Sequence, residues 1–287
     1  MTTPSRERLL RLVRRADADP AEAALLCAVE ADPDLDVDAA LLRVDALADT
    51  VRTRARSGAA GEPRMDPGTD PRTDPGAAAD VLAAELGGRQ GFTGDTAAYH
   101  DPANALLHRV LERKRGLPIA LAIVYVGIAR RLGVPAYAIA LPGHVVAAVA
   151  DGANPIVLDP FHGGIRLDEP SLVARVAAAT GGQVAYHRAM LRPAPTVALV
   201  RRLLNNLTRD LAAAEQPLAA LRTVELKLLL PNREPTDHRV LGELSLRAGR
   251  FDRAAAAFET YLAQLDAHDP DREAVRRAAI GARARTN

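Results

Sequence analysis

The chain has 287 residues, which suggests one to two domains, and 48% of them are hydrophobic, enough for a sizeable core. It carries 37 basic and 36 acidic residues. This balance argues against a dedicated nucleic-acid-binding protein, because such proteins show a basic excess. Trp is absent and aromatic residues make up 3%, so we expect a core built mainly of Ala, Leu and Val.

The single cysteine, Cys27, lies in a largely apolar stretch, 21–29, that is typical of a helix. One cysteine excludes an intramolecular disulfide and a multi-cysteine zinc site, and a small buried hydrophobic side chain is its expected role. The sequence shows neither the basic-then-apolar start of a signal peptide nor an apolar run of membrane-spanning length. We therefore expect a cytoplasmic protein without a membrane partner.

Residues 1–53 are predicted to form an N-terminal helical region, because Leu9, Val13, Leu47 and Val51 belong to apolar groups at helical spacing. From 54 to 78 repeated Asp-Pro pairs and the scarcity of large apolar residues predict a disordered linker. We interpret it as an insertion between two helices of one domain. A phosphate- or metal-binding role for its aspartates is the alternative.

The helical pattern resumes over 79–86, and Asp101-Pro102 marks the start of a further predicted helix that Gly116 closes. The next predicted helix, about 118–132, begins with Pro118, because proline fits the first turn of a helix. It is apolar nearly all round, which favours a central, buried position.

Short strands are predicted over 136–141, 145–150 and 155–158, separated by Pro-Gly and Asp-Gly turns. Another helix is predicted over 171–178. The predicted fold class is α+β, with an antiparallel sheet of short strands behind a buried helix.

The C-terminal part, 193–287, is predicted to be all-α with a pair of repeats. The small and large residues recur at tetratricopeptide spacing, although Thr223 replaces the usual bulky residue in the first unit. The residues concerned are Ala219, Thr223 and Pro231, then Leu241, Gly242, Gly249, Ala254 and Phe258. Two such units cannot bury their faces alone, so we expect them to dock on the core or on a partner.

Four motifs occur in order: Arg115-Gly116-Leu117-Pro118, Leu132-Gly133-Val134-Pro135, Leu141-Pro142-Gly143-His144 and Leu158-Asp159-Pro160-Phe161. This order resembles the papain-like core of the transglutaminase-like superfamily, which implies such a core over 79–192. In that superfamily a Cys at a helix start, a His opening a strand and an Asp on the next strand form a triad. The resemblance aligns His144 and Asp159 with the His and Asp, and Pro118 with the Cys.

A more specific resemblance, to the SirB-like bacterial family, adds the segments 99–104, 107–119 and 159–164, and less specifically Val29-Glu30 and Pro33-Asp34-Leu35-Asp36. In that family a transglutaminase-like core precedes tetratricopeptide repeats, and many members carry Pro at the Cys position. Here Ala105 stands where Ser is frequent, and His162 where Asn is usual. The resemblance implies a binding site that includes Tyr99, Asp101, Asn104, Glu112, Arg113, Phe161 and His162.

Each of these residues has a structural interpretation as well. His144 and Asp159 are predicted to hydrogen-bond across the Asp151-Gly152 turn, either as a structural remnant of a triad or as a catalytic pair. The free ring nitrogen of His144 is then expected to face Pro118. Asn104 is a candidate for backbone capping. Residues 112–115 suit a solvated helix end, with a buried salt bridge as the alternative.

His144, Asp159 and His162 could also supply nitrogen and oxygen ligands to a metal ion, but the sequence lacks the helical His-Glu motif of zinc hydrolases. We therefore expect no metal and no cofactor.

Two functions remain open. No Ser, Thr or Cys occurs from 106 to 168, so the first hypothesis is a non-catalytic protein that binds a protein or peptide, with no nucleic-acid partner. The second is a hydrolase or acyltransferase of non-thiol mechanism, in which His144 is the general base and Asp159 orients it.

Overall fold

The computed structural model describes residues 3–57 and 73–286 of the chain. Three helices lead the fold: α1 (Pro4–Leu12), α2 (Pro20–Ala28) and α3 (Val37–Ser57). The first two begin with proline, and the side chains of Thr3 and Asp19 accept backbone N–H groups there. The predicted linker begins within α3, and over 58–72 it lies outside the described residues.

After this gap, α4 (Pro75–Leu82) continues into a π-helical turn, η1 (Ala83–Arg89). Two short strands then pair in parallel, β1 (Thr93–Gly94) with β2 (Arg115–Gly116). The prediction of one continuous helix from Asp101 to Gly116 is wrong. This segment contains two separate elements, the 3-10 turn η2 (Pro102–Asn104) and the helix α5 (Leu107–Arg113). Lys114, with a φ of 58°, ends α5, and Gly116 belongs to β2.

The buried helix α6 (Pro118–Arg131) lies at the centre, and every residue from Pro118 to Ala129 is buried. It packs on a four-stranded antiparallel sheet in the order β3-β4-β5-β6. The strands are β3 (Ala136–Leu141), β4 (His144–Val149), β5 (Ile156–Asp159) and β6 (Ile165–Leu167). The 3-10 turn η3 (Pro160–His162) joins the last two. Strand β6 was not predicted from the sequence.

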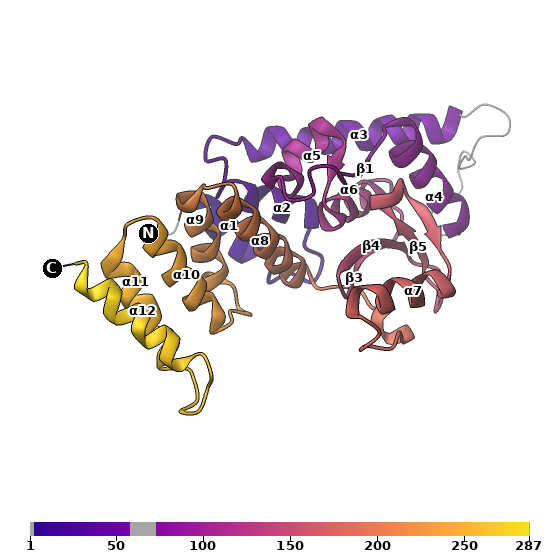
Figure 1. The fold of residues 1–287 in the computed structure, drawn as a ribbon. Coiled ribbons are helices and arrows are strands. Elements are labelled where there is room, and N and C mark those ends of the chain that lie inside the picture. The colour runs from indigo at the N-terminus through magenta and orange to yellow at the C-terminus, as the bar shows by residue number, and fades with distance from the viewer. Residues whose placement is uncertain (1–2, 58–72, 287) are drawn as a thin grey trace.

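The sheet is covered on both faces (Figure 1). One face meets α6, and the other meets α7 (Glu169–Thr180) and the 3-10 turn η4 (Arg188–Leu191). Strand alternation divides the side chains accordingly. In β4, Val145, Ala147 and Val149 belong to the main core around α6, whereas Val146 and Ala148 belong to the smaller cluster under α7.

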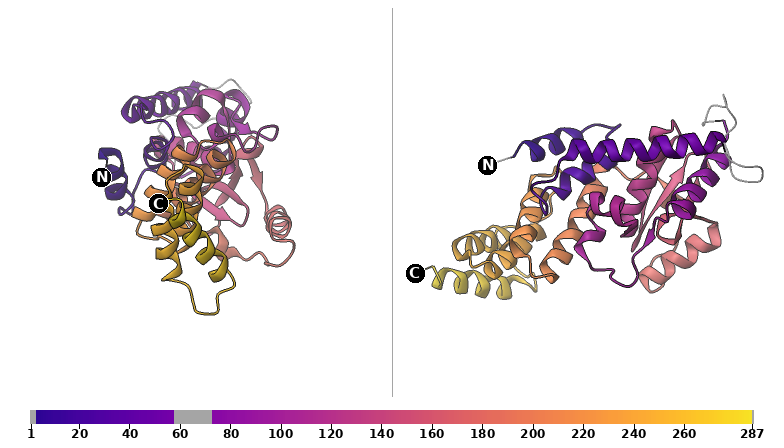
Figure 2. Two further views of the ribbon diagram at one scale, coloured as in Figure 1. Left: turned by 60° about the vertical axis from the view of Figure 1, so that its left-hand side comes forward. Right: turned by 90° about the horizontal axis from the view of Figure 1, so that it is seen from above.

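Five helices complete the chain: α8 (Thr196–Ala213), α9 (Pro217–Leu229), α10 (Thr236–Arg247), α11 (Phe251–Leu262) and α12 (Arg272–Ala284). They extend away from the sheet, as Figure 1 and the right-hand view in Figure 2 show. The main core runs from α1 through α6 to α10 and includes Ala257 of α11, while the other buried residues of α11 pack with α12 in a cluster of their own. At Gly242 any β-carbon would lie 2.5 Å from the ring of Phe258, which explains the small residue there.

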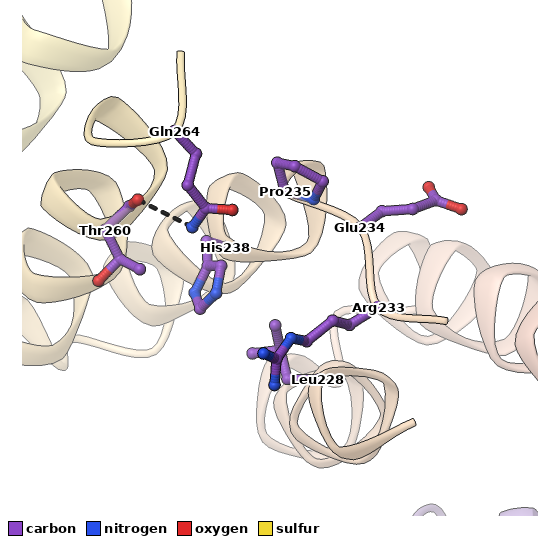
Figure 3. Close-up of a pocket in the computed structure, with 7 residues that line it drawn as sticks. All are labelled: Leu228, Arg233, Glu234, Pro235, His238, Thr260 and Gln264. Atoms are coloured by element: carbon purple, nitrogen blue, oxygen red, sulfur yellow. Dashed lines mark hydrogen bonds between the residues drawn. The ribbon is translucent and has the colours of Figure 1, made fainter. Parts of the chain in front are cut away.

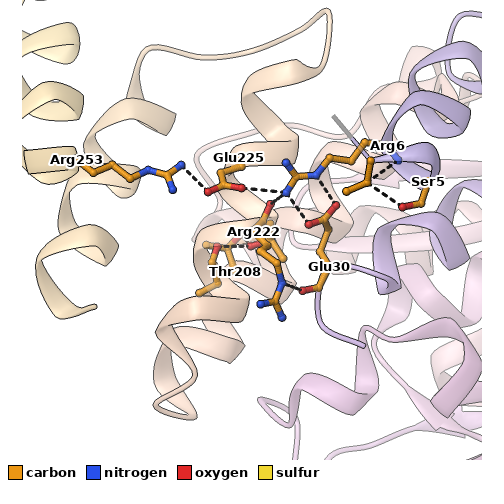
Figure 4. A network of polar contacts seen from close by, with 10 residues as sticks. Ser5, Arg6, Glu30, Thr208, Arg222, Glu225 and Arg253 are labelled. Carbon is orange, nitrogen blue, oxygen red and sulfur yellow. Dashed lines mark hydrogen bonds and ion pairs between the residues drawn. The ribbon is translucent and has the colours of Figure 1, made fainter. Parts of the chain in front are cut away.

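A buried ionic network joins the first and last parts of the chain (Figure 4). Arg6 of α1 donates to both carboxylate oxygens of Glu30, at 2.8 Å each, and to Glu225 of α9 at 3.1 Å. Arg222 donates to the backbone oxygen of Glu30, and Arg253 of α11 pairs with Glu225. We call these five residues the Glu30 network. It fixes the C-terminal helices to α1 and to the end of α2.

Within the described residues, no helix is both long enough and apolar enough to cross a bilayer.

Candidate functional site

His144 and Asp159 lie at the same end of the sheet. The β3–β4 turn has Gly143 at a φ of 66°, which a side chain would strain, and His144 opens β4 directly after it. Asp159 closes β5 beyond the last residues paired between the two strands, Ala147 and Leu158. The predicted hydrogen bond is confirmed, because His144 Nε2 and Asp159 Oδ1 are 2.9 Å apart.

Asp159 is fully buried and has further partners besides His144. Its carboxylate lies 2.8 Å from Nδ1 of His162 and 2.7 Å from the guanidinium of Arg175 in α7, and it accepts the N–H of Phe161 at 3.1 Å. We call Asp159, His144, His162 and Arg175 the Asp159 cluster. Burial alone would raise the pKa of Asp159, but the bonds to His144 and His162 and the charge of Arg175 lower it overall.

The face on which the cluster lies matters for chemistry. The strand alternation places His144 on the same face as Val146 and Ala148, and Asp159 on the same face as Val157, all three of which belong to the cluster under α7. Arg175 reaches Asp159 from α7 itself. That the free ring nitrogen of His144 faces Pro118 stays a prediction.

The start of α6 lacks a nucleophilic side chain. Pro118 is its first residue, and Leu117 before it makes no side-chain cap. Two hydroxyl groups lie in the neighbourhood. Thr93 donates to the backbone oxygen of Phe161 at 3.1 Å. The hydroxyl of Tyr125 in α6 is buried without a hydrogen-bond partner among the described residues. Burial and the charge of Asp159 raise the pKa of Tyr125, which keeps it protonated.

Two of the predicted binding residues are aromatic and lie beside the cluster. The ring centroid of Phe161 lies 6.0 Å from that of His144 and 6.0 Å from that of Tyr99, and both pairs are T-shaped. Gly94 accommodates Phe161, because a β-carbon there would lie 2.3 Å from the ring. His162 belongs to the cluster itself. The structure thus brings Tyr99, Phe161 and His162 together with the His144–Asp159 pair.

Three further predicted residues serve the loop before α6. Asp101 caps η2 and pairs with Arg113 at 2.9 Å. Asn104 is fully buried, its amide donates to Ala98, and its backbone oxygen accepts the N–H of Leu117. These bonds position the start of α6. The capping interpretation of Asn104 is therefore confirmed.

Glu112 lies elsewhere. It pairs with Arg43 at 2.8 Å and with Arg109 at 3.3 Å. The side chains of Glu112 and Arg113 are 42% and 36% exposed, so the alternative of a buried salt bridge at this helix end is wrong.

Cys27 lies in α2 and is fully buried, as expected. Burial raises the pKa of its thiol, so the reactive thiolate is disfavoured.

A metal ion could in principle use His144, Asp159 and His162, whose ligand atoms lie within 4.8 Å of one another. However, these atoms face each other in hydrogen bonds, and Arg175 supplies a positive charge 2.7 Å from the shared carboxylate. Both features oppose a cation at this point. The donor set therefore fits a closed hydrogen-bonded cluster better than a metal centre.

Arg175 is the member of the cluster that the sequence analysis missed. An arginine on an amphipathic helix is usually solvated, so no pattern marked it. Thr93 lies outside the segment 106–168 and Tyr125 is a phenol, so the absence of Ser, Thr and Cys from that segment pointed to neither residue.

The fold and the cluster together define an α+β protein with a hydrogen-bonded His–Asp pair at one end of the sheet and a proline at the start of the buried helix. Residues 38–205 match the family described as the transglutaminase-like superfamily. This match covers more than half of the 287 residues, so the chain belongs to the transglutaminase-like superfamily.

Individual relatives agree with that membership. The UPF0162 protein of Xylella fastidiosa strain 9a5c is 35% identical over 175 residues, which cover 60% of this chain and 62% of that protein. The match thus spans less than two thirds of the relative's length. Human F-box only protein 21 is 37% identical over 70 residues, 24% of this chain and 11% of that protein. A crystal structure of menin aligns with 96% of this chain and 73% of the menin chain at 14% identity. Its TM-score of 0.39 is too low to indicate a shared fold.

Proposed function

We propose that this chain is a SirB-like, cytoplasmic protein that uses a transglutaminase-like core without its nucleophile as a scaffold, and binds a protein or peptide through tetratricopeptide-like helices. The observation that carries the proposal is the start of α6. Proline begins this helix where the resemblance places the nucleophile, and the His144–Asp159 pair is engaged in a closed cluster with Arg175.

A cavity of about 560 Å³ in the C-terminal helices supports this proposal (Figure 3). It lies between the end of α9, the loop before α10, and the end of α11. Arg233 points back over Leu228 toward His238, whereas Glu234 points away and pairs with Arg201 at 2.7 Å. The guanidinium of Arg233 makes no hydrogen bond or ion pair with the described residues. We therefore propose an acidic peptide segment as the ligand.

The second candidate is a hydrolase or acyltransferase of non-thiol mechanism. Its support is the 2.9 Å bond between His144 and Asp159, which is the orientation that a general base requires. Two observations weigh against this candidate. The carboxylate of Asp159 already bonds to His162 and Arg175 besides His144, and proline, which has no nucleophilic side chain, begins α6. Neither His144 nor Asp159 lines the cavity of the C-terminal helices.

Fluorescence anisotropy with two pools of labelled octapeptides tests the binding proposal. We expect the pool rich in Asp and Glu to bind, the pool rich in Lys and Arg not to bind, and Arg233→Glu to abolish binding. Arg276→Glu, an exposed position on α12, is the matched control and should leave binding unchanged. Equal binding of both pools, or equal effects of the two variants, would contradict the proposal.

A second assay separates the two candidates. The protein is incubated with a glutamine-containing peptide and a primary amine, and amide transfer and hydrolysis are followed by mass spectrometry. We expect no product, because Pro118 cannot attack and Cys27 is buried. Product that disappears on Cys27→Ala would mean that a thiol mechanism operates after all. Product that needs His144 would favour the second candidate.

A further inference from the structure

A small cavity of about 230 Å³ lies between the segment after α2, the first turns of α3, and α5. Several residues that the sequence motifs singled out meet here although they are far apart in the chain. Asp34, Leu35 and Asp36 come from the N-terminal motif, and Glu112 comes from the predicted binding set. Neither the Asp159 cluster nor the cavity of the C-terminal helices shares a lining residue with it.

A buried histidine lines this cavity. His108 of α5 is 4% exposed, and neither ring nitrogen has a hydrogen-bond partner among the described residues. Its Nε2 lies 3.2 Å from Asp32 Oδ2, but outside hydrogen-bond geometry. Buried polar atoms nearly always have a hydrogen-bond partner in proteins. A ligand that bonds to this imidazole would supply the partner that the described residues do not. Burial, with the charge of Arg109, lowers the pKa of His108 below 6.5, so the ring is neutral at pH 7.

The charges around His108 favour a cation. Four carboxylates and two guanidinium groups line the cavity. Both arginines are already engaged, since Arg43 and Arg109 pair with Glu112, and Arg109 also lies 3.6 Å from Asp32. Asp36 accepts the N–H of Ala39 at 2.9 Å and so offsets the positive end of α3. Asp34 makes no hydrogen bond or ion pair with the described residues. A surplus of negative charge therefore remains beside a neutral imidazole.

We propose that this cavity binds the ammonium group of a small organic cation. An alkylammonium has three N–H donors, and three acceptors are at hand in Asp32, Asp34 and the neutral ring of His108. The alkyl part would lie against Leu35, Ala39 and Ala40. An anion would meet the unpaired carboxylate of Asp34, and it would leave the buried lone pair of His108 without a donor.

Isothermal titration calorimetry of the full chain at constant ionic strength tests the proposal. The probes are 1,4-diaminobutane and succinate, which share a four-carbon skeleton and carry opposite charges. We expect heat of binding from the diamine and none from succinate. Asp34→Asn should weaken diamine binding about three- to fivefold, as for a partly exposed charge pair. Asp151→Asn, an exposed aspartate in the β4–β5 turn, is the control and should leave it unchanged.

The pH dependence gives an independent readout. Besides His108, the groups facing it are Asp32 from the segment after α2, Arg43 from α3, and Arg109 and Glu112 from α5. Protonation of His108 would repel a bound ammonium, so diamine affinity should fall as the pH drops through the lowered pKa of His108. In His108→Gln, checked for a cooperative thermal transition, binding should be about tenfold weaker or lost, and this component of the pH dependence should disappear.

Several outcomes would overturn the proposal. One is succinate binding as tightly as the diamine, or affinity rising as the pH falls. Another is no binding of the diamine at 10 mM by wild-type protein, or equal effects of Asp34→Asn and Asp151→Asn. Binding of Zn²⁺ without binding of the diamine would identify a metal site instead.

Discussion

Two buried carboxylates organise this molecule, and they differ in how far apart their partners lie in the chain. Asp159 is 0% exposed and Glu30 is 4% exposed, and a guanidinium binds each of them. The partners of Asp159 all come from one stretch, 144–175, in the sheet and α7. Arg6 links Glu30, 24 residues away, to Glu225, which is 219 residues from Arg6.

The difference shows that similar chemistry serves two purposes. The Asp159 cluster closes one end of the sheet and depends on local geometry, namely a hairpin and the helix that follows it. The Glu30 network forms only when the C-terminal helices have docked on α1 and α2. Damage to the cluster should therefore weaken the sheet, whereas damage to the network should loosen the docking of the helices.

The largest effect is expected at Asp159. Asp159→Asn removes the charge that three cationic or hydrogen-bonding side chains share, and it leaves Arg175 without a counterion. We expect a loss of about 3–5 kcal/mol in the free energy of unfolding, measured in urea. Asp151→Asn, exposed in the β4–β5 turn, is the control and should cost less than about 0.5 kcal/mol. A loss below 1 kcal/mol at Asp159 would show that the cluster contributes little.

The lowered pKa of Asp159 predicts how the stability of the protein depends on pH. The pKa of Asp159 in the folded protein is below its ordinary value of 3.8. Its contribution is therefore present above the unfolded pKa and is lost as the pH falls through the folded pKa. We expect the difference in unfolding free energy between wild type and Asp159→Asn to shrink as the pH falls below about 4. A difference that grows on acidification would contradict the lowered pKa.

Glu30→Gln should come next. It keeps the shape of the side chain but removes the charge that binds Arg6 at two oxygens. We expect a loss of about 1.5–3 kcal/mol. Hydrogen–deuterium exchange distinguishes this loss from that at Asp159, because amides of α1, α9 and α10 should exchange faster while β4 and β5 stay protected. Faster exchange confined to the sheet would refute the role of docking assigned to the Glu30 network.

His144→Ala should cost about 1–3 kcal/mol, because Asp159 loses one of its hydrogen bonds but keeps His162 and Arg175. If the pair is structural, affinity for the acidic octapeptide pool should stay within twofold of wild type. Loss of binding or of activity at nearly unchanged stability would instead assign His144 a direct functional role.

The sequence predicted what local patterns determine. The bounds of β3 were predicted as observed, β4 and β5 were within one residue at each end, and α6 was correct because twelve consecutive residues of it are apolar or small. The hairpin order then brought His144 to Asp159. Strand β6 was missed because two of its three residues are exposed, which leaves no apolar alternation to detect.

Contacts between distant segments could not be predicted in this way. Nothing in the pattern around Arg6 or Glu225 marks either as a partner of Glu30, since charged residues on helices are usually solvated. For the same reason, the sequence pattern did not predict that Arg175 belongs to the Asp159 cluster or that His108 lines the cavity beside α5. The end of α5 was misplaced because Lys114, rather than a glycine, adopts the left-handed conformation there.

The smallest effect is expected at Glu225, where the comparison can be made within one network. Its side chain is 24% exposed, against 5% for Glu30, and solvent screens its pairs with Arg6 and Arg253. We expect Glu225→Gln to cost about 0.2–1 kcal/mol, less than Glu30→Gln. The double variant should lose less than the sum of the two, because both carboxylates share Arg6. Unfolding in urea at low and high salt measures this. The loss at Glu225 should diminish in 1 M NaCl, and a salt-independent loss as large as that of Glu30→Gln would mean that burial does not rank these two carboxylates.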